Sequence, residues 1–145
     1  MWGMSVIVKK ITQLMCALIF VYGIYIITHG HLTPGGGFAG GALVAGAFIL
    51  LILANGSEYV RLKKQEEGSS MMESAALIAA LVLASSGLIA GSMVFFNNFL
   101  PAGIPGQLAS GGVIPFFNIF IGIKVAAALL TIFLALVIYR EDISK

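Results

Sequence analysis

The chain has 145 residues, of which 59% are hydrophobic and only 10% charged, and its mean hydropathy is +1.04. Soluble domains carry about 25% charged residues, and so short a chain leaves much of its surface in contact with solvent. Eight basic and six acidic residues cannot cover that surface in water. Composition therefore excludes a soluble enzyme and predicts an integral membrane protein. The formal charge of +2, with no basic stripe, also excludes a nucleic-acid-binding protein.

Cys16 is the one cysteine of the sequence, so the chain can form neither an internal disulfide nor a cysteine-based metal cluster. Because it lies in an apolar run, we interpret it as a small packing residue rather than a reactive thiol.

Apolar residues form four stretches of 18 residues or more, at about 11–28, 35–54, 73–97 and 113–139. Each is long enough to cross a hydrocarbon core of roughly 30 Å. The sequence therefore predicts an all-α membrane protein, with residues 1–145 forming one membrane domain of four transmembrane helices bundled in lipid. The first stretch follows two lysines, as in a signal peptide. No cleavage-like site follows it and the next span begins within ten residues, so we interpret it as a retained helix.

The basic residues outside the spans predict the orientation of the chain. Two precede the first span, three lie between the second and third, and two follow the fourth: Lys9, Lys10, Arg61, Lys63, Lys64, Arg140 and Lys145. The other two connections contain none. This positive-inside asymmetry places both termini and the 55–72 loop in the cytoplasm.

The connections carry two further expectations. The mixed charges of the 55–72 loop suit a solvated connector, or a docking site for a soluble partner. Glu73 follows it at the start of the third span, where a carboxylate complements a helix N-terminus. The outer connection, 97–112, has no charge, which fits a turn at the membrane surface or burial beneath neighbouring subunits.

Small residues dominate the start of the second span. Thr33 is the expected N-cap and Pro34 the first helical residue. Two overlapping GxxxG pairs follow, Gly36/Gly40 and Gly37/Gly41. Such faces let helix backbones approach closely in lipid. Since the third span adds more small residues, the total exceeds what four helices need, and we expect several faces to contact other chains.

Lys124 is the one charged residue in the interior of a predicted span. It lies nine residues after Pro115, or about 13 Å along a helix axis. An ionisable residue at this depth is a candidate functional group; the alternative is a structural lysine held by carbonyls and one acid. Because Glu73 is placed at the inner end of its span, Lys124 has no expected counter-ion in its own chain. Either burial keeps the amine neutral part of the time, or another subunit supplies an acid. Both options suit a proton or cation pathway.

Four other polar residues join Lys124 as candidates for the ion pathway. Thr131 falls on the same helical face, seven residues on, and Asn118 lies about a third of a turn away. His29 and His31 flank Gly30 at the outer end of the first span. They either sit in polar surroundings or admit protons, since histidine titrates near neutral pH. Their spacing does not suit a shared metal, and the sequence predicts neither a metal site nor catalytic residues.

The segment 30–41 resembles the MrpB (also called MnhB) subunit of multisubunit Na+/H+ antiporters, whose second helix begins with a GH-x-x-PGGGF-x-GG signature. The matching residues are Gly30, His31, Pro34, Gly35, Gly36, Gly37, Phe38, Gly40 and Gly41. That family is similar in length and has four helices. The resemblance implies a multi-pass subunit of the plasma membrane, within a hetero-oligomer of several membrane subunits that exchanges Na+ and H+.

The same resemblance extends to archaeal membrane-bound hydrogenases and sulfane sulfur reductases, in which an antiporter-like module is joined to a redox arm. Bacterial antiporter subunits have an acid near position 118 and no lysine at 124, whereas Asn118 with Lys124 is more similar to the archaeal respiratory forms. The resemblance therefore implies a complex that couples redox chemistry to ion translocation. Its [NiFe] and iron–sulfur centres would lie in other subunits, with no cofactor in this chain. A stand-alone antiporter subunit and a purely structural scaffold are the alternatives.

Overall fold

A computed structural model describes residues 4–56, 62–89, 94–108 and 110–143, of which 62–64 and 141–143 are described by backbone alone. It contains four α-helices: α1 (Val6–Thr28), α2 (Gly36–Asn55), α3 (Leu62–Ile89) and α4 (Ile114–Ile143). Each is long and apolar enough to cross a membrane, and the described residues form no strand. The predicted all-α class with four transmembrane helices is confirmed.

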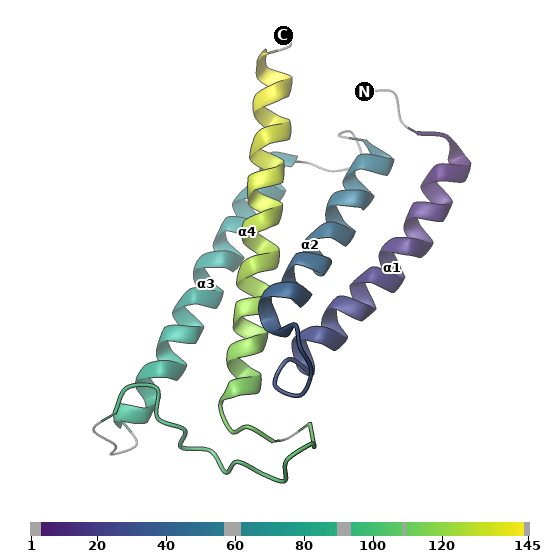
Figure 1. The fold of residues 1–145 in the computed structure, drawn as a ribbon. Helices are drawn as coiled ribbons and strands as arrows, with labels where there is room; N and C mark the ends of the chain where they lie inside the picture. The colour runs from purple at the N-terminus through teal and green to yellow at the C-terminus, as the bar shows by residue number, and fades with distance from the viewer. Residues whose placement is uncertain (1–3, 57–61, 90–93, 109, 144–145) are drawn as a thin grey trace.

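The helices lie in a row, in the order α1, α2, α4, α3 (Figure 1). α2 packs between α1 and α4, and α3 packs on the far side of α4. The row is open rather than closed into a compact bundle, so most large apolar side chains are exposed; Leu134, against Ile52, is the most deeply buried. Both ends of the chain lie at the same end of the helices, which we call the termini end of the row (Figure 1). Which side of the membrane this end faces stays a prediction from the basic residues.

Glycines determine how closely α2 approaches both neighbours. A Cβ on Gly40 would lie 2.7 Å from the carbonyl oxygen of Gly23 in α1, and one on Gly41 would lie 2.5 Å from that of Gly122 in α4. The two GxxxG registers thus face two helices of the same chain. α1 and α4 of the same chain contact the two GxxxG pairs of α2, whereas a Cβ on Gly46 would meet nothing within 4 Å; contact of small-residue faces with other chains stays a prediction.

The turn into α2 differs from the expected cap. The helix begins at Gly36 with Gly35 as its N-cap, and no side chain caps it. Thr33 instead donates its hydroxyl hydrogen to the carbonyl of His29, extending the end of α1. Gly35 and Gly36 have φ values of +143° and +67°, which side chains disfavour. The chain reverses on these two glycines, and the predicted N-cap at Thr33 is wrong.

α3 differs most from its predicted span. Its described part runs from Leu62 to Ile89, so it starts well before residue 73, and residues 94–97 are not helical although the predicted span reaches about 97. Hydropathy detects only its apolar part, whereas the polar residues before it continue the same helix without a proline to stop it. Glu73 consequently lies eleven residues inside α3 and does not complement its N-terminus. Beyond the helix, Phe96 has a positive φ of 64° and donates its N–H to the carbonyl of Ala84.

Cys16 is only 4% exposed, which confirms its interpretation as a packing residue.

Candidate intramembrane charge site

A pair of opposite charges joins α3 to α4. Lys124 Nζ of α4 lies 3.6 Å from Glu73 Oε1 of α3. Lys124 is ten residues from the start of α4, about 15 Å, and Glu73 is eight residues from Gln65, where the apolar span of α3 begins, about 12 Å. Both charges are therefore well inside their spans.

The prediction that Lys124 lacks a counter-ion in its own chain is wrong. It followed from placing Glu73 at the inner end of the third span, but α3 extends eleven residues further back than position 73. The antiparallel pairing of α3 and α4 then brings Glu73 level with Lys124. An acid from another subunit is not needed to pair this lysine.

A hydrogen bond between two hydroxyls lies beside the ion pair. Ser69 Oγ, one turn before Glu73, is 2.7 Å from Thr131 Oγ1 of α4, and either can donate. Ser69 also reaches the carbonyl of Glu66, and Thr131 that of Ala127. Thr131, predicted from its position on the Lys124 face, therefore does lie beside the charge site.

The pair remains partly open on the outside of the row. The side chains of Lys124 and Glu73 are 41% and 33% exposed. Hydrocarbon is a poor environment for charge, with a cost of about 2.5–3.5 kcal/mol per central Lys or Asp even on lenient scales. Such exposed charges require water or another polar protein surface beside them.

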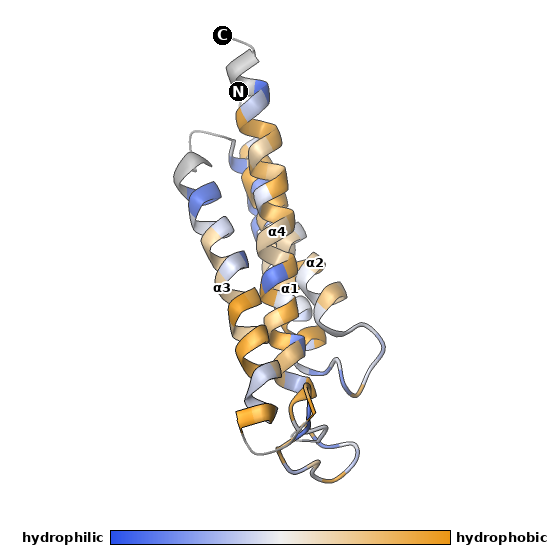
Figure 2. Cartoon of the chain, turned by 90° about the vertical axis from the view of Figure 1, so that its left-hand side faces the viewer, coloured by the Kyte–Doolittle hydropathy of each residue, from blue (hydrophilic) through white to orange (hydrophobic). Residues whose placement is uncertain are grey.

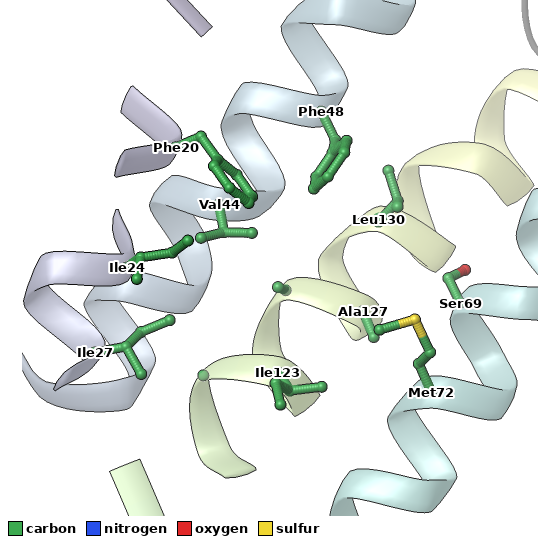
Figure 3. Close-up of a pocket in the computed structure, with 12 residues that line it drawn as sticks. Phe20, Ile24, Ile27, Val44, Phe48, Ser69, Met72, Ile123, Ala127 and Leu130 are labelled. Atoms are coloured by element: carbon green, nitrogen blue, oxygen red, sulfur yellow. The ribbon is translucent and has the colours of Figure 1, made fainter. Parts of the chain in front are cut away.

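The opposite face of the row is apolar. It forms a groove of about 400 Å³ to which all four helices contribute (Figure 3). Phe20, Ile24 and Ile27 come from α1, Val44 and Phe48 from α2, Met72 from α3, and Ile123, Ala127 and Leu130 from α4. Ser69 is the one polar residue of this lining, and its hydroxyl is already bonded to Thr131. The two faces of the α3–α4 pair thus differ sharply in polarity.

The remaining candidates gather at the other end of the row, away from Lys124. Asn118 faces the turn into α2, where a Cβ on Gly30 would lie 2.9 Å from its Nδ2. The Nδ2 of Asn118 and both ring nitrogens of His31 are buried without a hydrogen-bond partner. His29 instead stacks on Tyr25, at 4.1 Å between ring centroids, and its Nδ1 lies 3.0 Å from the Tyr25 carbonyl oxygen. The structure does not join this group to the charge site.

The sequence reasoning missed Glu73 and Ser69 as members of the site. Two signals could have found them: the four-residue spacing from Ser69 to Glu73, and the lack of any helix breaker other than glycine in the polar segment before the third span. Within the described residues, no group of three His, Cys, Asp or Glu side chains could hold a metal ion.

Comparisons with known proteins agree on one family. A family model described as a domain related to the MnhB subunit of Na+/H+ antiporter matches residues 7–131. An uncharacterized protein of Methanocaldococcus jannaschii is 36% identical over 138 residues, which cover 90% of this chain and 52% of that protein. In Staphylococcus aureus strain Newman, the protein named "Putative antiporter subunit mnhB2" is 39% identical over 56 residues, 39% of this chain and 40% of that one. The matched regions span about half or less of these relatives.

Proposed function

Because the chain belongs to the family of domains related to the MnhB subunit of Na+/H+ antiporters, we propose that it takes part in ion translocation, with the Glu73–Lys124 pair as its working element. The family and the four apolar helices make it a multi-pass membrane protein of the antiporter-subunit type. The contribution of these two residues to the exchange of Na+ and H+, and the other membrane subunits it works with, are parts of the proposal.

The position of the pair carries this proposal. An ion pair that is partly withdrawn from water adds little stability, because the cost of removing its charges from water offsets much of their attraction, and α3 and α4 already pack through buried small residues such as Ala76 and Ala84. Stability alone therefore gives little reason for two charges here. A carboxylate paired with an ammonium has two states, since a proton or cation reaching Glu73 weakens its attraction for Lys124. Such a switch suits coupled ion movement.

A wider assembly is proposed on different grounds. The archaeal relative, from M. jannaschii, matches 90% of this chain, whereas the bacterial S. aureus subunit matches 39%. In addition, Asn118 with Lys124 is the pattern expected of the archaeal respiratory forms. We place the subunit in a complex that couples redox chemistry to ion translocation. Its [NiFe] and iron–sulfur centres would be bound by other subunits. The stand-alone antiporter is the alternative context, and purification from native membranes distinguishes them by the presence or absence of iron–sulfur absorption.

A double substitution tests whether the pair translocates ions or only holds helices together. Glu73→Leu/Lys124→Leu removes both charges at once and leaves no unpaired group. We expect the complex to assemble at near-normal yield while sodium-dependent proton flux per complex, measured in sealed vesicles, falls at least tenfold. Gly46→Ala is the matched control, because a Cβ there meets nothing within 4 Å. Normal flux in the double variant would favour the scaffold alternative.

A further inference from the structure

A second groove runs along the α3–α4 pair near the ion pair, and polar residue types make up most of its lining. It has a volume of about 570 Å³ and is lined by Glu66, Glu67, Ser70, Met71, Ser74 and Thr131. Residues 66, 70 and 74 recur every four positions, so they form one stripe along α3. The stripe covers nine residues, a rise of about 12 Å along the helix, starting near the inner end of the apolar span. Figure 2 shows α3 hydrophilic toward the end of the row that holds the termini and apolar toward the other.

Glu73 and Lys124 do not line this groove, but Glu73 lies three residues after Ser70 and seven after Glu66, on the adjacent side of α3. Ser74, its deepest residue on α3, directly follows Glu73, and Thr131 lies on the Lys124 face of α4, seven residues away. Beyond Ser74 the exposed residues of α3 are apolar: Leu77, Ile78, Leu81 and Val82. The polar stripe therefore runs from the side of the termini to the depth of the two charges, and continues no further along α3.

We propose that this groove is a water-filled entrance through which a cation, H+ or Na+, reaches Glu73 from the side of the membrane that holds the termini. This role presupposes the translocating function proposed above. Ser70, Ser74 and Glu67 are exposed, and polar side chains at membrane depth face water-filled cavities or protein rather than lipid. The described lining offers carboxylate and hydroxyl oxygens, and the carboxylates of Glu66 and Glu67 attract cations; the side chains of Lys63 and Lys64, which precede them on α3, lie outside the described residues. Water in the groove also explains how the charges of Glu73 and Lys124 remain partly exposed.

Cysteine accessibility tests this entrance independently of transport. In the whole complex with Cys16→Ala, single cysteines replace Ser70 or Ser74, and a membrane-impermeant cationic methanethiosulfonate is added on the termini side of sealed vesicles. Ala75→Cys is the matched control, since it is exposed at the depth of Ser74 but points to another side of α3. We expect both groove cysteines to react at least tenfold faster than the control. Rates as slow as the control would show that lipid or a partner subunit fills the groove, and would overturn the entrance.

A second readout connects the groove to ion movement. Modification at Ser70→Cys or Ser74→Cys places a fixed positive charge in the groove and should lower sodium-dependent proton flux at least tenfold, whereas the same treatment of Ala75→Cys should leave flux unchanged. Complete modification with unaltered flux would also overturn the entrance. Neither result depends on the Glu73→Leu/Lys124→Leu variant: if that variant transports normally, the proposed function fails, whatever the accessibility of the groove.

Discussion

The hydroxyl oxygens of Ser69 and Thr131 lie 2.7 Å apart and join α3 to α4 one turn from Glu73. This contact fixes the register of the two antiparallel helices. Sliding α3 by one turn, about 5.4 Å, would break the hydrogen bond and separate Glu73 from Lys124. The neutral pair of hydroxyls therefore positions the charged pair, while the buried alanines beside it supply close packing without directional preference.

This positioning predicts a modest energetic coupling. In a double-mutant cycle of Ser69→Ala and Thr131→Val, we expect an interaction free energy of about 0.6 kcal/mol, the average for hydrogen bonds between transmembrane helices. The measurement is the unfolding of the purified chain in detergent by increasing denaturant. Ser85→Ala is the control, because its hydroxyl bonds only to the carbonyl of Leu81 in its own helix. Strictly additive effects of the two substitutions would show that the Ser69–Thr131 hydrogen bond does not set the register of α3 and α4.

The close approach of α2 to α4 gives a second prediction. Gly41→Ala should destabilise the chain by about 1–3 kcal/mol, because its Cβ would meet the rigid backbone of α4, 2.5 Å from the Gly122 oxygen. Gly46→Ala, on the same helix but in open space, should be neutral or slightly stabilising. Thermal unfolding of the two variants in the same detergent measures the difference, and equal midpoints would contradict the packing.

How far the sequence predicted the structure depends on what each signal measures. Hydropathy located four membrane helices, because burial in lipid requires continuous apolar length. The same signal misplaced the start of α3, since a helix can continue into water with polar residues. Glu73 was therefore placed at the end of its span, and its pairing with Lys124 was not predicted. The GxxxG pattern correctly marked Gly37, Gly40 and Gly41 as contact positions. It could not show that the partners are α1 and α4 of the same chain, because small residues indicate that another helix packs closely but not which helix it is.

The orientation of the row is a third prediction. The positive-inside rule places the termini in the cytoplasm. With Cys16→Ala as background, Gln65→Cys should react with an impermeant thiol reagent from the cytoplasmic side, and Gln107→Cys from the outside. Both residues are exposed; Gln65 lies in the first turn of α3, and Gln107 lies in the connection that follows the other end of α3. Reversed accessibility at both positions would invert the topology and also move the mouth of the polar groove to the outside.

The last prediction concerns the kind of cation at position 124. Arginine stays protonated and binds a carboxylate in a bidentate fork, so Lys124→Arg should hold Glu73 more firmly than lysine does. If ion movement requires the pair to loosen, flux per complex should fall at least tenfold although assembly and thermal stability are kept or improved. If the pair is only structural, Lys124→Arg should keep normal flux per complex as well as normal assembly and thermal stability. Lys124→Leu alone gives the complementary result, because it leaves the carboxylate of Glu73 inside its span without its counter-ion, and we expect it to lower the yield of assembled complex. Measuring yield, thermal midpoint and sodium-dependent proton flux on the same preparations separates the two roles, and normal flux in Lys124→Arg would show that the pair need not open during transport.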